Sequence, residues 1–151
     1  MTKNNNNPAP VLLVGCSKSK LDCTARASEL YTGTGFRMAR RLAELRGAHW
    51  GIVSALYGLV LPHWYLRPYD QRLGADRLEL RLWAHETATR AMGAFEWPKA
   101  VELYMGATYA DPLRLELEAR GVAVAEPLRG LGTGARLHRL RELLELEGVA
   151  A

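Results

Sequence analysis

Short runs of apolar residues alternate along the chain with segments in which apolar residues recur every three or four positions. The first run, residues 11–14, is continuously apolar, which is typical of a strand buried on both faces of a parallel sheet. Later runs of this kind predict further strands, and the helical spacing between them predicts helices. The predicted strands are residues 11–14, 50–55, 100–105 and 122–125, and the predicted helices are residues 36–45, 75–92, 111–120 and 135–147.

Three details of this pattern are specific enough to be tested. The dipeptide Asp111-Pro112 resembles a helix start, with a capping aspartate before a proline. An additional strand is expected within residues 60–67. The helix over residues 75–92 is expected to turn four apolar positions toward the core: Leu78, Leu82, Ala88 and Met92.

Alternation of strands and helices predicts an α/β fold. We expect a single Rossmann-like three-layer domain, with a mainly parallel sheet of four to five strands flanked by helices. A length of 151 residues fits one domain. Residues 1–10 are rich in asparagine and predict a disordered tail, which leaves residues 11–151 as the domain.

Composition narrows the function only slightly. Hydrophobic residues make up 48% and charged residues 24%, as in ordinary globular proteins, and the net charge of +4 permits an anionic partner without requiring one. Apolar runs are too short for a membrane span, so we expect a cytoplasmic protein with reduced thiols. Two cysteines and four histidines lack the spacing of a zinc site, and neither a metal nor another cofactor is predicted.

Each predicted strand is followed by a loop that contains glycine and polar or aromatic residues. The carboxyl ends of parallel strands meet at one edge of a sheet, so these loops predict a common pocket. The first loop combines small polar side chains with Lys18 and Lys20, which suits a phosphate group, and a glycine-rich turn precedes the last helix. The candidate ligand-binding residues are Gly15, Lys18, Lys20, Tyr31, Tyr57, Gly58, Arg67, Tyr69, Gly106, Tyr109, Gly130, Gly132 and Gly134.

Alternative interpretations exist for these residues. The lysines could be solvated side chains at an ordinary strand end, and the glycines near residue 132 could form a hinge. Four tyrosines are candidates for stacking on a nucleobase: Tyr31, Tyr57, Tyr69 and Tyr109. Some of these four are instead expected in the core.

Four side chains are candidates for chemistry. Cys16 is a candidate nucleophile, with packing as the simpler explanation. Asp70 is a candidate general base or a helix cap. Ser17 and Ser54 are expected to be polar groups near the reacting atom.

Several of these segments resemble a known family. Residues 15–20 (Gly-Cys-Ser-Lys-Ser-Lys), residues 54–59 (Ser-Ala-Leu-Tyr-Gly-Leu), residues 68–70 (Pro-Tyr-Asp) and residues 127–132 resemble a family of short bacterial and phage domains of unknown function. The middle segments also look like the YaaA family of peroxide-stress proteins, which implies DNA binding and protection against oxidative stress. The Cys-Ser-x-x-Lys region is similar to that of archaeosine synthase, which implies chemistry on a nucleobase.

Together these observations lead to two hypotheses. The first is an enzyme directed at a nucleotide or nucleic acid, a hydrolase or transferase acting on a base or ribosyl group in nucleic-acid modification or damage response. The second is a non-catalytic DNA-binding protein of stress protection, which needs a contiguous basic face. Candidates for that face are Arg37, Arg40 and Arg41, or Arg136, Arg139 and Arg141.

Overall fold

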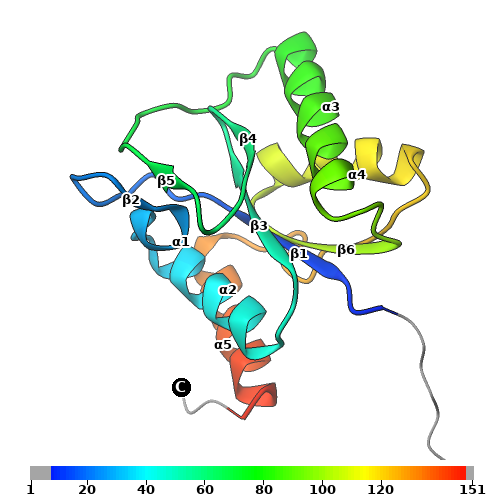
Figure 1. The fold of residues 1–151 in the computed structure, drawn as a ribbon. Helices are drawn as coiled ribbons and strands as arrows, with labels where there is room; N and C mark the ends of the chain where they lie inside the picture. Colours follow the sequence, from blue (N-terminus) through cyan, green and yellow to red (C-terminus); the bar gives the residue numbers. More distant parts are fainter. Residues whose placement is uncertain (1–7, 149–151) are drawn as a thin grey trace, which may run out of the picture.

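A computed structural model describes residues 8–148 of the chain as an α/β fold with a mostly parallel five-stranded sheet (Figure 1). Residues 1–7 of the predicted tail lie outside the described part, and residues 8–10 carry no regular secondary structure. The sheet has the order β4-β3-β1-β6-β7. In that order, the strands are Gly58–Val60, Trp50–Ser54, Val11–Gly15, Ala100–Tyr104 and Ala123–Ala125.

Strand β1 occupies the centre of the sheet and pairs in parallel with β3 and β6. Its first four residues are buried, as the continuous apolar run predicts. Strand β7 extends the parallel sheet beyond β6, and β4 returns antiparallel along β3 after a short turn. All four predicted strands are therefore confirmed.

The expected additional strand is present in a different arrangement. The fifth strand of the main sheet is β4, which overlaps the predicted segment only at Val60. Within residues 60–67 the chain forms β5 (Tyr65–Leu66), which pairs with β2 (Ala25–Arg26) in a separate two-stranded sheet.

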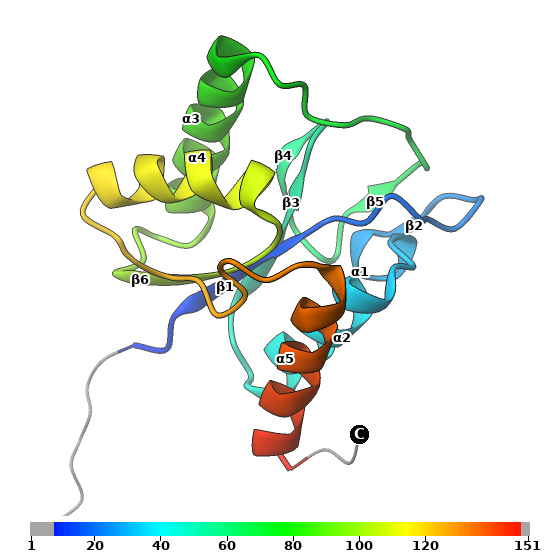
Figure 2. The same cartoon turned by 180° about the vertical axis from the view of Figure 1, so that it is seen from behind.

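Helices cover both faces of the main sheet (Figures 1 and 2). The short helix α1 (Ala27–Leu30), α2 (Thr34–Leu45) and α5 (Thr133–Leu146) lie on one face, and α3 (Arg77–Ala94) and α4 (Ala107–Ala119) lie on the other. Each face has its own apolar cluster, so β1 contributes Leu12 and Val14 to one cluster and Val11 and Leu13 to the other. Within residues 8–148, no helix is both long and apolar enough to cross a bilayer.

The prediction of the buried face of α3 is correct for only two of its four residues. Ala88 and Met92 are buried, but Leu78 and Leu82 are 65% and 56% exposed. The N-terminal turns of α3 extend beyond the edge of the sheet in Figure 1, so the leucines there find no sheet surface to cover. Only the C-terminal half of this helix packs over the strands.

The predicted start of the next helix was wrong. Helix α4 begins at Ala107 with Gly106 as its N-cap, and Asp111 and Pro112 lie inside it. The carbonyl of Gly106 accepts hydrogen bonds from the N–H groups of Tyr109 and Ala110, which starts the helix upstream of the proline. Packing of Leu113 and other buried positions outweighs the one helical hydrogen bond that a proline forfeits.

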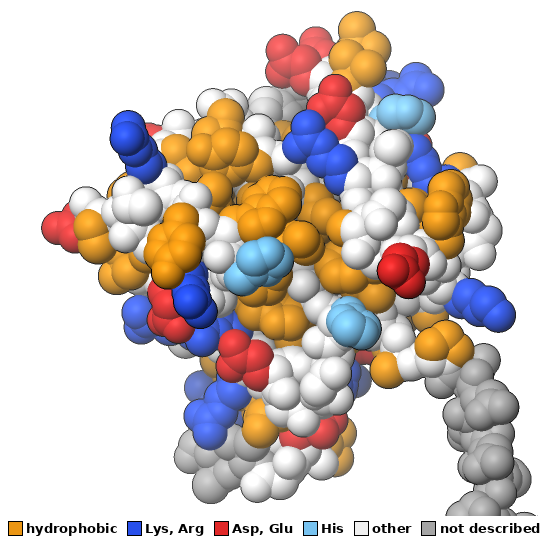
Figure 3. Space-filling model, in the orientation of Figure 1, with side chains coloured by type: hydrophobic (Ala, Val, Ile, Leu, Met, Phe, Trp, Pro, Cys, Tyr) orange, Lys and Arg blue, Asp and Glu red, His pale blue; other side chains and the backbone are white. Residues whose placement is uncertain are grey.

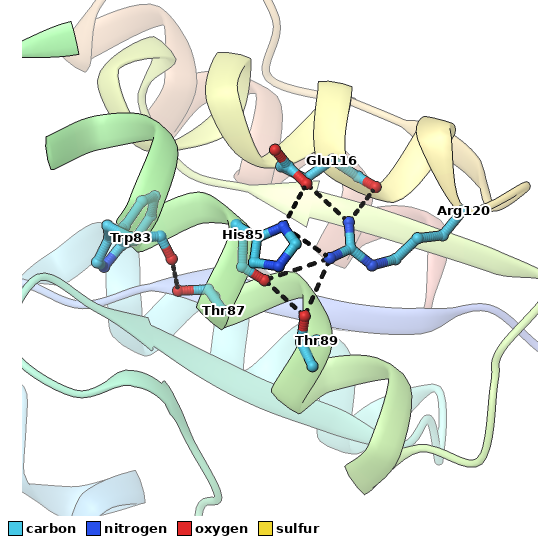
Figure 4. Close-up of polar contacts among 6 residues, drawn as sticks. All are labelled: Trp83, His85, Thr87, Thr89, Glu116 and Arg120. Atoms are coloured by element: carbon cyan, nitrogen blue, oxygen red, sulfur yellow. Dashed lines mark hydrogen bonds and ion pairs between the residues drawn. The ribbon is translucent and has the colours of Figure 1, made fainter. Parts of the chain in front are cut away.

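A polar cluster joins α3 and α4 on the side away from the sheet (Figure 4). The Arg120 guanidinium donates to a Glu116 carboxylate oxygen at 2.8 Å and to the Thr89 hydroxyl at 3.0 Å. His85 Nδ1 lies 3.3 Å from the same Glu116 carboxylate. The cluster fixes the crossing of the two helices, and α4 carries part of the site described next.

Candidate ligand-binding site

The carboxyl ends of β1 and β6 form a crevice in the sheet. The chain leaves β1 toward α2 on one face, and it leaves β6 toward α4 on the other face. Adjacent parallel strands whose connections diverge in this way mark the place where open α/β sheets bind ligands. The floor is tightly packed, because a Cβ on Gly15 would lie 2.8 Å from the Cβ of Met105.

A cavity of about 710 Å³ occupies this crevice. Its size is within the range of small-molecule sites. Aliphatic and aromatic side chains of α2, α5 and the loop before α5 form its apolar part, namely Phe36, Ala39, Leu128, Leu137 and Leu140. The remaining lining residues come mainly from the ends of β1 and β6 and from the first turns of three helices: Val14, Gly15, Cys16, Thr34, Gly35, Tyr104, Met105, Gly106, Ala107, Thr108, Tyr109, Thr133 and Arg136.

Three helices begin at this cavity, and each has a glycine as its N-cap. These N-caps are Gly33 for α2, Gly106 for α4 and Gly132 for α5. Glycine has no side chain with which to cap the N–H groups of the first turn. The helix dipoles add positive potential at the same ends, so the cavity is suited to an anionic group.

Arg136 is the one charged side chain among the residues that line the larger cavity. Its guanidinium lies directly over Gly106, where a Cβ would come within 2.7 Å of Nη1. The same guanidinium reaches the Thr133 hydroxyl at 3.4 Å. An arginine held over the N-terminus of α4 strengthens the preference of this end of the cavity for a negative charge.

A smaller cavity of about 360 Å³ adjoins the first. Cys16, Thr108 and Tyr109 line both cavities and so mark their boundary. The other lining residues come from the loop after β1 and from the segment before α3: Ser17, Lys18, Lys20, Asp70, Gln71, Arg72 and Leu73.

Behind this boundary lies a chain of hydroxyl groups. The Tyr69 hydroxyl lies 2.6 Å from Ser54 Oγ and 2.5 Å from the hydroxyl of Tyr31. Ser54 and Tyr31 are buried, whereas Tyr69 is half-buried. The ammonium group of Lys20 lies 4.5 Å from the centre of the Tyr69 ring, close enough for a cation–π interaction.

The environment changes the acidity of two phenols next to Cys16. Burial raises the pKa of Tyr69 to about 12, against the opposing effect of its hydrogen bonds with Ser54 and Tyr31. Burial also raises the pKa of Tyr109 to about 12, and the adjacent Cys16 thiol contributes to this rise. Both phenols are therefore protonated at neutral pH and can serve as hydrogen-bond donors beside the thiol.

Comparison with protein-family models matches residues 11–142 to a family described as "Family of unknown function (DUF6884)". The chain belongs to this family. A search of curated proteins finds no match for the chain. The matched region of this DUF6884 member runs from β1 into α5 and contains every residue that lines the two cavities.

The structure of this DUF6884 member brings about half of the predicted site residues together. Of the seventeen candidates named from the sequence, one group lines one or both of the cavities described above: Gly15, Cys16, Ser17, Lys18, Lys20, Asp70, Gly106 and Tyr109. Gly130 and Gly132 line a neighbouring hollow of about 400 Å³ that shares Gly106 and Arg136 with the larger cavity. Gly134 follows in the first turn of α5.

The remaining candidates lie behind or beside the cavities. Tyr31 belongs to the apolar core, and Tyr57 packs edge-on against Tyr69. Gly58 lies at the start of β4 with φ +70°, where a Cβ would come within 2.8 Å of Thr87 Oγ1, so its glycine is required by the turn. Arg67 is exposed and lines neither cavity.

Both serine candidates have their hydroxyl groups engaged. Ser17 Oγ donates to the carbonyl of Ser19 at 2.7 Å and accepts from the N–H of Gly33 at 3.1 Å, which ties the loop after β1 to the start of α2. Ser54 Oγ accepts from the N–H groups of Leu56 and Tyr57. Asp70 does not cap a helix, since the N-cap of α3 is Asp76, whose carboxylate accepts from the N–H of Glu79.

Sequence analysis missed several residues of the larger cavity. Arg136 was predicted only as part of a basic helix face, and Thr34, Thr108 and Leu137 were not among the site candidates, although Thr108 belongs to a loop predicted to help form the pocket. No local pattern marks Arg136, because its place over Gly106 is a contact between residues 30 positions apart. Among residues 8–148, no group of three or more histidine, cysteine or acidic residues could hold a metal ion.

Proposed function

We propose that the protein is an enzyme that binds a nucleotide in the larger cavity and acts on its base or ribosyl group. The observation that carries this proposal is that three glycine-capped helix N-termini and Arg136 line one cavity together with an apolar wall that includes Phe36, Leu137 and Leu140. The helix N-termini and Arg136 suit a phosphate group. The apolar wall suits a sugar–base unit.

The phosphate is placed at the starts of α4 and α5. Arg136 can donate to phosphate oxygens together with the first N–H groups of both helices, because its guanidinium lies over Gly106. The base then extends toward Phe36, Leu137 and Leu140, which offer an apolar and partly aromatic surface. This arrangement leaves the ribosyl group near the boundary residues Cys16, Thr108 and Tyr109.

The chemistry follows from the groups at that boundary. Cleavage or transfer at a glycosidic bond requires a group that takes a proton from the incoming nucleophile and a donor that assists the departing base. Asp70 is the carboxylate of the adjoining cavity and takes the first role, and the protonated phenol of Tyr109 takes the second. Ser17 and Ser54 are positioning residues, because their hydroxyl groups hold the loops around the site.

The same proposal extends to the wider relationship of the family. The order and direction of β3, β1, β6 and β7 support a Rossmann-like class, and the resemblance of residues 54–59 supports a distant link to YaaA proteins. Both features agree with a nucleotide-type ligand at the carboxyl edge of the sheet.

Isothermal titration with the four common ribonucleoside 5′-monophosphates and the matching nucleosides tests the proposal. We expect at least one monophosphate to bind, its nucleoside to bind more weakly, and Arg136→Gln to weaken the monophosphate alone. Arg81→Gln, an exposed change on α3 that lines neither cavity, is the matched control. A protein that binds none of these compounds, or an Arg136→Gln variant with unchanged affinity, contradicts the proposal.

Catalysis is tested separately on any monophosphate that binds. Release of the free base is followed by chromatography for the wild type and for Asp70→Asn. We expect the variant to bind the nucleotide normally and to release base far more slowly. Equal rates in the two proteins would remove Asp70 from the mechanism.

The arrangement of basic side chains does not favour the DNA-binding alternative. Arg40 pairs with Glu29 at 2.9 Å and with Glu44 at 2.7 Å, and Arg139 pairs with Glu142 at 3.1 Å. On the face seen in Figure 3, lysine and arginine side chains are scattered toward the periphery among acidic ones. Tight, strongly salt-dependent binding to duplex DNA would reverse this preference.

A further inference from the structure

The smaller cavity differs in chemistry from the larger one, although the two meet. Its charged lining residues are three cations, Lys18, Lys20 and Arg72, and one anion, Asp70. The larger cavity has Arg136 alone. One ligand of uniform chemistry would not need two adjoining compartments with such different linings.

None of these three cations has a carboxylate partner in the part of the chain that the structure describes. Lys18, Lys20 and Arg72 take part in none of the ion pairs within 4.0 Å there, whereas Arg40, Arg114 and Arg120 are all paired. The third cation, Lys20, donates to the carbonyl of Lys18 at 3.1 Å and is held over the Tyr69 ring. The positive charges at this cavity are therefore not neutralised by ion pairs with carboxylates of the described residues.

Arg72 lines the smaller cavity together with Tyr109, one of the three boundary residues. The charge of Arg72 opposes the rise in the pKa of Tyr109, in keeping with this shared lining. Tyr109 lines both compartments, as do Cys16 and Thr108. An anion held by Arg72 would thus be adjacent to the ligand in the larger cavity.

We propose that the smaller cavity is a second binding site, which takes the phosphate group of a separate substrate while the nucleotide occupies the larger cavity. Lys18 and Arg72 bind the phosphate, and the two ligands meet at Cys16, Thr108 and Tyr109. This inference rests on the proposed function and makes the enzyme a transferase: a phosphate oxygen forms a bond to C1′ of the ribosyl group as the C1′–N bond to the base breaks. Asp70 takes the proton of the phosphate, and Tyr109 gives a proton to the departing base. The separate substrate is inorganic phosphate, and the experiment distinguishes it from the terminal phosphate of a single longer nucleotide that spans both cavities.

Isothermal titration measures inorganic phosphate binding to the free protein and to protein saturated with the nucleoside monophosphate that binds best. We expect one phosphate to bind to the saturated protein, because the nucleotide then occupies the anion site of the larger cavity. Arg72→Gln is expected to weaken phosphate by about tenfold, the effect of one charge-assisted hydrogen bond, and to leave the affinity for the monophosphate unchanged. Lys18→Gln acts in the same direction, and Arg81→Gln on α3 is the control.

The possible outcomes separate this inference from the proposed function. Absence of phosphate binding to the saturated protein, or full phosphate affinity of saturated Arg72→Gln, overturns the second site and leaves nucleotide binding intact. A nucleoside diphosphate whose affinity depends on Arg72, with no binding of free phosphate, shows a single extended ligand and overturns the separate substrate. Arg72-dependent phosphate binding without any nucleotide binding supports the second site and overturns the proposed function.

Discussion

The hydroxyl of Ser54 donates a hydrogen bond to the phenolic oxygen of Tyr69 across 2.6 Å. This direction follows because Ser54 Oγ already accepts two backbone N–H groups, each at 3.2 Å, which leaves its own proton for Tyr69. The buried Tyr31 hydroxyl lies 2.5 Å from the same phenolic oxygen, and Tyr69 is its only hydrogen-bond partner within residues 8–148. Both buried hydroxyl groups therefore depend on the Tyr69 hydroxyl.

Substitution Tyr69→Phe removes the hydrogen-bond partner that Ser54 and Tyr31 share. We expect the free energy of unfolding to fall by about 1–3 kcal/mol, because two buried hydroxyl groups lose their partner. Urea denaturation followed by circular dichroism measures the change. Tyr57→Phe is the control, since Tyr57 is 37% exposed and its ring only packs against that of Tyr69. Equal losses in the two variants would contradict the hydroxyl chain.

Alkaline pH should destabilise the protein through the same phenols. The folded-state pKa of Tyr69 and of Tyr109 is about 12, above the ordinary value of 10.0. Their contribution to stability is therefore fully present below pH 10 and is lost as the pH rises from 10 through 12. Urea midpoints between pH 8 and pH 11.5 should decline above pH 10, and Tyr69→Phe should decline less steeply. A wild-type midpoint that stays constant up to pH 11.5 would disprove this.

Local patterns in the sequence were enough to predict the four parallel strands of the sheet and most of the helices, but not the antiparallel strand β4. The apolar run of residues 11–14 identifies β1 because a strand buried on both faces leaves no polar position. The pattern failed where tertiary contacts decide. Leu78 and Leu82 look like core residues, yet α3 extends past the sheet there, and Asp111-Pro112 looks like a cap although α4 already starts at Gly106.

The site residues also divide into those that a local sequence pattern predicts and those that only tertiary contacts determine. The loop after β1 could be found because its small and basic residues follow directly on a buried strand. Arg136 could not be assigned to the cavity, since its place over Gly106 depends on how α5 packs against α2, on the opposite face of the sheet from α4. The contacts of Tyr69 with Ser54 and Tyr31 join residues 15 and 38 positions apart, which no local pattern encodes.

The cluster between α3 and α4 should make stability depend on acid pH. The Arg120 guanidinium holds the pKa of the Glu116 carboxyl below its usual range. That contribution is present above the ordinary pKa of glutamate and is lost as the pH falls through the lower folded-state value. We expect Glu116→Gln to lose about 0.5–1 kcal/mol at neutral pH, as for partly exposed ion pairs, and nothing at the acid end of the range.

Thermal unfolding between pH 2.5 and pH 7 measures this difference. Glu118→Gln is the matched control on α4, because Glu118 approaches Arg114 only to 3.9 Å and is 49% exposed. A gap between Glu116→Gln and the wild type that stays constant down to pH 2.5 would contradict the assignment.

Two glycines should respond in opposite directions to the same change. A Cβ on Gly15 would lie 2.8 Å from the Cβ of Met105, so Gly15→Ala should destabilise the fold by about 1–3 kcal/mol through overpacking. Gly93 lies inside α3, and a Cβ there meets no described atom within 4 Å, so Gly93→Ala should stabilise the fold by about 1 kcal/mol. Melting temperatures of the two variants give the comparison, and a stabilised Gly15→Ala would show that the crevice floor is looser than described.

The three glycine N-caps differ in how easily a substitution could replace them and stabilise their helices. Serine or aspartate at such positions strengthens a helix by a few tenths of a kcal/mol over glycine. Gly33 and Gly106 are obstructed, by the Ser17 side chain at 2.6 Å and by Arg136 at 2.7 Å, whereas a Cβ on Gly132 meets none of the described atoms within 4 Å. Directed evolution for thermostability would therefore reach Gly132→Asp first, and the lineages that fix it would trade anion affinity for a better-anchored α5.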